Sequence, residues 1–108
     1  MAAGGMVGFP DAATIARAIV EACRLFGEDP EAMARGNASR ARHVAFDALL
    51  TVYPAASRVV LARCLGYRHP RNGGSQLTLA RQTSWWSDIH SDEVIGALVA
   101  DRYGEQAG

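Results

Sequence analysis

The chain has 108 residues, of which 49% are hydrophobic, and its 11 basic and 11 acidic side chains give a net charge of zero. This composition excludes a disordered chain and fits one domain with a single core. No apolar run reaches the roughly 18 to 20 residues of a membrane span, and residues 1–10 lack the features of a signal peptide. We therefore expect a cytoplasmic protein in which residues 1–10 form a flexible tail.

The zero net charge conceals a strong segregation of charge along the chain. Residues 1–34 carry two Arg and five carboxylates, residues 35–81 carry eight Arg and one Asp, and residues 82–108 carry one Arg and five carboxylates. The middle segment therefore has a charge of +7 between flanks of −3 and −4. Such a segment is typical of a protein that binds a polyanion, and we expect double-stranded DNA as its partner.

Two helices are predicted before the basic segment. Asp11 is placed to cap a helix that ends at Gly27, and apolar residues recur between them at spacings of three and four. The Asp-Pro-Glu sequence at 29–31 then combines a cap, a first-turn proline and an acid near the positive helix end. That second helix is short and is expected to end near Gly36.

Four further helices follow. One starts at Asn37 or Ser39 and runs to Tyr53, and the next spans residues 55–65. A polar turn leads to a helix over 75–82, and the last helix follows, capped by Ser91 and ended by Gly104. In the 55–65 helix the expected inward residues are Val59, Val60, Cys64 and Leu65. With no strand pattern, the prediction is an all-α bundle of about six helices, of the Trp-repressor type.

The helices at 55–65 and 75–82 have the order of a helix-turn-helix, whose second helix sets its N-terminal residues against base edges in the major groove. Two helices joined by a glycine turn are also common in bundles that bind no DNA, but the charge of +7 favours DNA binding. Gly73 has no side chain to keep the backbone away from a phosphate. The residues expected to read bases are Arg71, Asn72, Ser75, Gln76 and Thr78. Those expected on the DNA backbone are Arg58, Arg63, Arg68 and His69.

Arg40 and Arg42 start a helix, where a cation is slightly unfavourable, so a compensating negative group is expected nearby. The alternative is that both are solvated surface charges. The segments SRARHVAFDALL at 39–50 and VVLARCLGYRHP at 59–70 resemble the C-terminal DNA-binding domain, domain IV, of the bacterial replication initiator DnaA.

This resemblance covers about residues 13–82, and we assign residues 11–83 to a DnaA-like domain. It implies that Arg40 is the loop arginine that enters the minor groove, that Arg42 is the second arginine of that pair, and that Arg68 is the basic residue of the turn. The family's Asp-His-Thr-Thr recognition signature is absent, and RHPRNGGSQLT stands at 68–78 instead. The target site of DnaA is therefore not carried over, and no P-loop of its ATPase domain occurs.

The tail WWSDIHSDEVIGALVADRYG makes the chain also resemble alphaproteobacterial gene-transfer-agent activators of the GafA and GafY type. That resemblance implies transcription activation with a sigma-like factor or RNA polymerase. Adjacent Trp85 and Trp86 cannot both face one core. Either one packs on the bundle while the other covers helix ends, or the pair forms a partner surface. Residues 84–108 are expected to form an acidic helix that offers a partner or dimer surface.

No pattern for catalysis, a metal or a cofactor is found. The serines lack a nucleophile elbow, and the two Cys and three His lack the spacing of a zinc site. Cys23 and Cys64 are expected to be buried thiols, and His43 and His90 surface or capping residues. The expectation is a nucleoid-associated, sequence-specific transcription regulator that is not an enzyme. The alternatives are an adaptor of the transcription machinery and a nucleoid-type protein with little sequence preference.

Overall fold

The computed structural model describes residues 8–107, and the side chains of residues 8–101. Residues 1–7 of the expected N-terminal tail lie outside the described residues. The described part has no strand, and it confirms the all-α prediction with six α-helices and one 3₁₀ turn. In chain order these are α2 (Ala12–Phe26), α3 (Pro30–Ala34), α4 (Arg40–Val52), α5 (Arg58–Cys64), η1 (Pro70–Asn72), α6 (Gly73–Ala80) and α7 (Asp88–Ala107).

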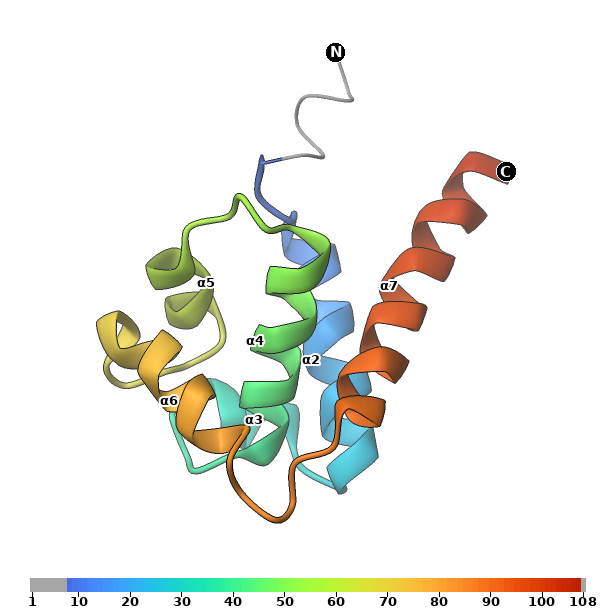
Figure 1. The fold of residues 1–108 in the computed structure, drawn as a ribbon. Helices are drawn as coiled ribbons and strands as arrows, with labels where there is room; N and C mark the ends of the chain where they lie inside the picture. Colours follow the sequence, from blue (N-terminus) through green and yellow to red (C-terminus); the bar gives the residue numbers. More distant parts are fainter. Residues whose placement is uncertain (1–7, 108) are drawn as a thin grey trace.

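Helix α4 is the centre of the fold. It packs against α2 and α7, which also pack against each other, so that these three helices form one body (Figure 1). Phe46 and Leu49 of α4 are fully buried, and the small residues Ala41, Ala45 and Ala48 allow neighbouring helices to approach closely. Removal of this apolar surface from water is the main favourable contribution to folding.

Helices α5 and α6 pack on the opposite side of α4 from α7, with η1 against the end of α5 (Figure 1). Leu61, Leu65 and Leu77 bury their side chains in this layer. The backbone of Gly73 lies against α5 and α4: a Cβ there would come within 2.9 Å of Ala62 Cβ and 3.2 Å of Phe46 Cε2. Gly73 therefore allows α6 to dock closely, and this is a packing role rather than the predicted approach to a phosphate.

The predicted starts and stops of the first three helices are confirmed. The side chains of Asp11, Asp29 and Ser39 each accept a hydrogen bond from a backbone N–H of the following turn. Gly27 ends α2 in the left-handed conformation, with φ of 65°. The local chemistry of capping is sufficient to place these boundaries, because it depends on a few adjacent residues.

Helix α5 differs from its prediction in both its start and its inward face. It begins at Arg58 rather than at residue 55, because Ser57 caps it by accepting a hydrogen bond from Val60 N–H at 3.3 Å. Val60 and Cys64 are exposed, so their predicted burial is wrong. The helix buries Leu61 and Ala62 in their place, together with Leu65 as predicted, a stripe that the sequence pattern allows equally well.

The predicted limits of the last two helices are also corrected. Helix α6 begins at Gly73, two residues before the expected Ser75, because η1 leads directly into it. Helix α7 begins at Asp88 and continues past Gly104. Ser91 is 3% exposed within this helix and does not cap it. Its hydroxyl has no hydrogen-bond partner among the described residues, whereas Ser87 Oγ accepts from Ile89 N–H at 3.3 Å.

Gly66 and Gly27 provide a matched test of how the loop after α5 is packed. Both have positive φ, but a Cβ at Gly27 would meet open space, whereas at Gly66 it would lie 2.5 Å from Met33 O. Gly27→Ala should lower the free energy of unfolding by about 1 kcal/mol, the cost of the left-handed conformation alone. Gly66→Ala should lower it by at least about 2 kcal/mol more, because the α3 backbone must move. Urea denaturation measures both, and equal losses would contradict the packing described for Gly66.

Candidate nucleic-acid interface

The region of α5, η1 and α6 is free of acidic residues. Between Asp47 and Asp88 the chain contains five Arg and no carboxylate. Four of these, Arg58, Arg63, Arg68 and Arg71, are exposed and form no ion pair with the described side chains. Arg81 differs, because it pairs with Asp47 and so joins the end of α6 to α4. The four unpaired guanidinium groups leave this side of the molecule positively charged.

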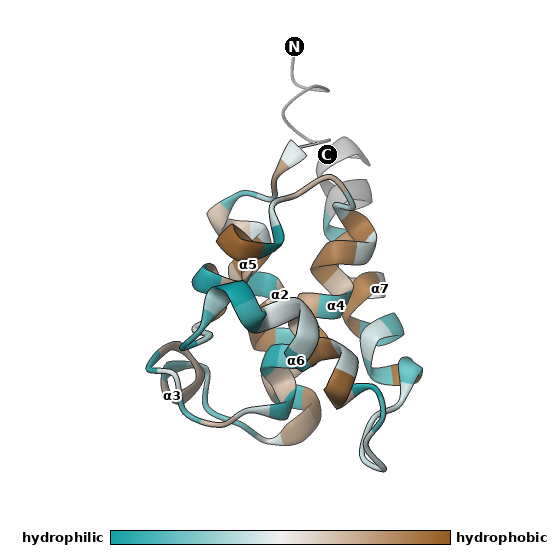
Figure 2. Cartoon of the chain, turned by 60° about the vertical axis from the view of Figure 1, so that its left-hand side comes forward, coloured by the Kyte–Doolittle hydropathy of each residue, from teal (hydrophilic) through white to brown (hydrophobic). Residues whose placement is uncertain are grey.

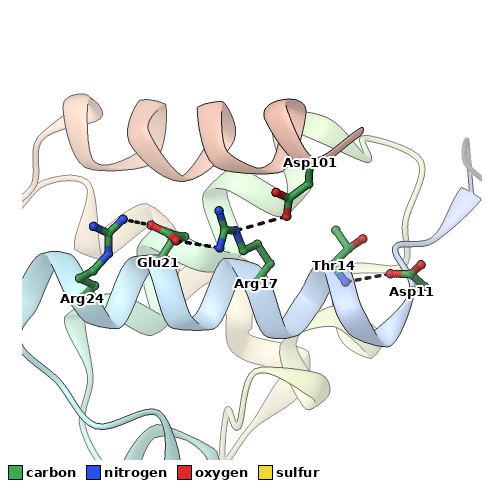
Figure 3. A network of polar contacts seen from close by, with 6 residues as sticks. All are labelled: Asp11, Thr14, Arg17, Glu21, Arg24 and Asp101. Carbon is green, nitrogen blue, oxygen red and sulfur yellow. Dashed lines mark hydrogen bonds and ion pairs between the residues drawn. The ribbon is translucent and has the colours of Figure 1, made fainter. Parts of the chain in front are cut away.

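Two carboxylates of the terminal helices are engaged with arginines of α2. Arg17 lies 3.2 Å from Glu21 on its own helix and 3.2 Å from Asp101 on α7, and Arg24 also pairs with Glu21 (Figure 3). The Arg17–Asp101 pair connects α2 to α7 on the side away from α5 and α6. The acidic flanks of the chain therefore do not neutralise the basic middle segment in the described structure.

A hollow of about 390 Å³ lies between the end of α5 and the 3₁₀ turn. In Figure 2, which brings this side forward, hydrophilic residues line the turn between α5 and α6. Arg58 extends the basic surface, since its Nη1 lies 4.0 Å from the position that a Cβ of Gly74 would occupy. The residues that line the hollow are Val59, Arg63, Arg68, His69, Pro70, Arg71 and Asn72. Three guanidinium groups around one concave surface are suited to phosphate oxygens.

A neighbouring hollow of about 330 Å³ connects this turn to the loop before α4. Arg68 Nε donates a hydrogen bond of 3.0 Å to Gly36 O, which links the turn to the end of α3. Gln76 of α6 lines the same hollow, together with Ala38. The structure thus brings the α3–α4 loop beside α6, although about 40 residues separate them in the sequence.

The outer side of α6 carries several of the residues predicted to read bases. Ser75 and Thr78 are exposed, and so are Arg71 and Asn72 in the preceding turn. Thr78 Oγ1 donates to Gly74 O at 3.1 Å, so its oxygen keeps only acceptor capacity for a ligand. Leu79, which was not among the predicted contacts, is 64% exposed on this helix. An exposed leucine there supplies apolar surface of the kind that contacts a thymine methyl group.

Arg42 was predicted to contact DNA, and the structure contradicts this. Its side chain is buried, and its guanidinium donates to Leu65 O at 3.0 Å and to Met33 O at 2.6 Å. Burial lowers the pKa of Arg42 from its ordinary value. The guanidinium supplies a donor to Leu65 O at the end of α5 and a further donor to Met33 O, which also accepts from Gly36 N–H at 3.0 Å, and so connects both helices to α4. Its role is structural.

Arg40 is exposed, as predicted, and a nearby carboxylate compensates for the unfavourable position of a cation at a helix start. Glu28 Oε2 accepts a hydrogen bond of 3.1 Å from Arg40 N–H, and the hydroxyl of Ser39 donates to the same carboxylate. The negative group expected near this helix start is therefore Glu28 of the same chain. The guanidinium of Arg40 makes no ion pair with the described carboxylates and lies 5.5 Å above the ring of Trp85.

The two tryptophans were expected not to share one core, and this is wrong. Both are half-buried and pack against the core, with ring centroids 5.6 Å apart. Trp85 meets Phe26 edge-on at 5.7 Å, and Trp86 Nε1 donates to Asp88 Oδ1 at 2.9 Å. They join the start of α7 to α2 and α4, so a large part of each ring is unavailable to a partner protein.

Histidine and cysteine side chains show no site for other chemistry in the described residues. No group of three or more metal-ligating side chains is found there, and none of the described helices has the length and apolarity that crossing a bilayer requires.

Cys23 is buried as predicted, and burial raises its thiol pKa to about 11, which makes it unreactive. His43 is half-buried rather than at the surface, with Nδ1 at 2.8 Å from Tyr67 Oη. His90 is likewise half-buried against Phe26.

No family model, curated protein or solved structure matches this chain. The resemblance to domain IV of DnaA therefore stays a prediction. The function has to be inferred from the residues and the geometry described above.

The different roles of Arg40 and Arg42 are testable by stability alone. Arg42→Ala leaves Leu65 O without its donor, removes one donor from Met33 O and empties the space of a buried side chain, so it should lower the free energy of unfolding by about 3 kcal/mol. Arg40→Ala, two residues away and exposed, should lower it by less than about 1 kcal/mol. Urea denaturation followed by circular dichroism compares the two variants. Similar losses in both would show that Arg42 does not hold the helix ends.

The buried ring of His43 should make the fold sensitive to acid. Burial first, and then the charge of Arg42, lower its pKa below the ordinary 6.5, while Glu28 opposes them. The unfolded chain therefore binds more protons as the pH falls below 6.5, and stability should decrease in that range. His43→Gln should flatten this part of the stability–pH curve. A wild-type curve that is flat between pH 7 and 5 would exclude the effect.

Proposed function

We propose that this protein is a sequence-specific, double-stranded DNA-binding transcription regulator and not an enzyme. The observation that carries the proposal is the group of exposed arginines without acidic neighbours around α5, η1 and α6. A helix-turn-helix places such groups on phosphates on both sides of the major groove.

The phosphate contacts come from two parts of the interface. Arg63, Arg68 and Arg71 surround the 390 Å³ hollow at the start of the η1–α6 segment, where the positive end of a helix adds to their charge. Arg58 contributes from the start of α5. His69, exposed in the same turn, contributes a donor when its ring faces a phosphate.

The base contacts come from η1 and the outer side of α6. Asn72 and Gln76 offer paired donors and acceptors for adenine, and Arg71 offers a fork for guanine. Ser75 and Thr78 lie beside them on the exposed side of the helix. Each good pair discriminates against a wrong base by about 1–3 kcal/mol, which is sufficient for sequence preference.

The resemblance to DnaA domain IV and to gene-transfer-agent activators directs the proposal toward transcription activation of a phage-like gene cluster. The same resemblance implies a protein partner, which is RNA polymerase or a sigma-like factor, and association with the nucleoid. The exposed acidic side chains Asp88, Asp92 and Glu93 make the first turns of α7 unsuited to DNA and suited to such a partner.

A second candidate function is an adaptor of the transcription machinery that binds protein only. Ile89 favours it, since this large apolar side chain is 67% exposed among the acidic residues at the start of α7. An adaptor of this kind would not retain a DNA duplex at about 0.15 M salt, so DNA binding distinguishes the two functions.

DNA binding should depend strongly on salt. With about five phosphates neutralised, the slope of log K against log salt should lie near −4 to −5, as measured by fluorescence anisotropy on a duplex selected from a random library. Arg63→Ala should make the slope shallower by about 0.9. Arg24→Ala is the matched control, because Arg24 is also exposed in the last turn of a helix but lies on α2 beside Glu21.

The selection also separates the proposed function from its alternatives. Enrichment of one motif supports sequence-specific binding, whereas tight binding without enrichment supports a nucleoid-type protein. A slope near zero, or equal effects of Arg63→Ala and Arg24→Ala, would overturn the proposal that this face binds DNA.

A further inference from the structure

The guanidinium of Arg40 is held by an aromatic ring from a distant part of the chain. It lies 5.5 Å from the centroid of Trp85, which belongs to the segment between α6 and α7. No described carboxylate pairs with Arg40, and the nearby Glu28 is occupied by Arg40 N–H and by the hydroxyl of Ser39. The indole face is therefore the group that orients this side chain.

The ring of Trp85 is itself fixed by its neighbours. Phe26 meets it edge-on at 5.7 Å, and the ring of His43 lies 6.5 Å away at an interplanar angle of 30°. Together with Arg40 and Glu28, these rings line a hollow of about 440 Å³ at the start of α4. A half-buried ring with contacts from α2 and α4 provides a rigid surface for the guanidinium.

The position of Arg40 relative to the proposed interface gives this contact a function. Ala38 lines both the hollow at Arg40 and the hollow that contains Arg68, His69 and Gln76. Arg40 therefore borders the helix-turn-helix surface from the α3–α4 loop. A long side chain held in one conformation before binding loses less rotamer freedom when it meets a ligand.

We propose that Trp85 is a positioning residue that presents Arg40 to the DNA as a contact outside the helix-turn-helix. This inference rests on the proposed function. It also reassigns Trp85 from the predicted partner surface to the support of the DNA-binding face, and it connects the segment before α7 to DNA affinity.

The test is a double-mutant cycle on the full chain, with DNA affinity as the readout. Trp85→Leu keeps apolar bulk but removes the ring face, and it should weaken binding about two- to fivefold, the ratio that corresponds to an exposed cation–π contact. Trp85→Phe retains a ring face and should bind like the wild type. In an Arg40→Ala background, Trp85→Leu should have no further effect.

The control is the adjacent tryptophan. Trp86 is equally half-buried, but its N–H is bonded to Asp88, so Trp86→Leu should change stability without lowering DNA affinity. A second measurement needs no DNA. In a Trp86→Phe background Trp85 is the remaining tryptophan, so its fluorescence can be followed alone. Arg40→Ala should increase the quenching of this fluorescence by acrylamide, because it uncovers the ring.

The outcomes separate this inference from the proposed function. If the wild type binds no duplex, both fail. If it binds and Trp85→Leu weakens binding equally with and without Arg40, the ring has only a structural role and this inference alone is overturned. An unchanged affinity for Trp85→Leu would overturn it as well.

Discussion

The hydrogen bonds of Arg42 hold together the part of the molecule that presents the candidate interface. Its guanidinium, on the central helix α4, binds the carbonyl oxygens of Met33 and Leu65 at the ends of two short helices. Helices of five and seven residues have little stability of their own, so they depend on such tertiary contacts. The turn after α5 starts at the residue that follows Leu65, and the position of η1 and α6 therefore depends on this contact.

Charge segregation follows from the way these helices are arranged. Glu21 of α2 pairs with Arg17 and Arg24 of the same helix, and Asp101 of α7 pairs with Arg17 across the α2–α7 contact. The arginines of α5 and its following turn lie on the other side of α4, and the segment between Asp47 and Asp88 that contains them has no carboxylate. A molecule with zero net charge thus has one basic side, and that asymmetry is what an anionic duplex would select.

The tryptophan pair connects the two sides of the molecule. Trp85 reaches the start of α4 and covers it with Phe26, while Trp86 bonds to the first residue of α7. In the proposed function, the segment between α6 and α7 supports DNA binding through Trp85, which orients Arg40. The exposed acidic turns of α7 remain available to bind a protein. One small domain would then combine two separate surfaces, as an activator requires.

The helical class, the caps at Asp11, Asp29 and Ser39, and the concentration of arginine in the middle segment were predictable from the sequence, because they depend on neighbouring residues or on composition. Which arginines are exposed depends on tertiary packing. Arg40 and Arg42 have similar neighbours in the sequence, but one lies over an indole and the other is buried against two carbonyl groups. Likewise, the rotation of α5 that exposes Cys64 depends on how it docks against α4 and α6, since its apolar residues allow two faces. Contacts between residues that are distant in the chain made these choices, and local patterns do not contain that information.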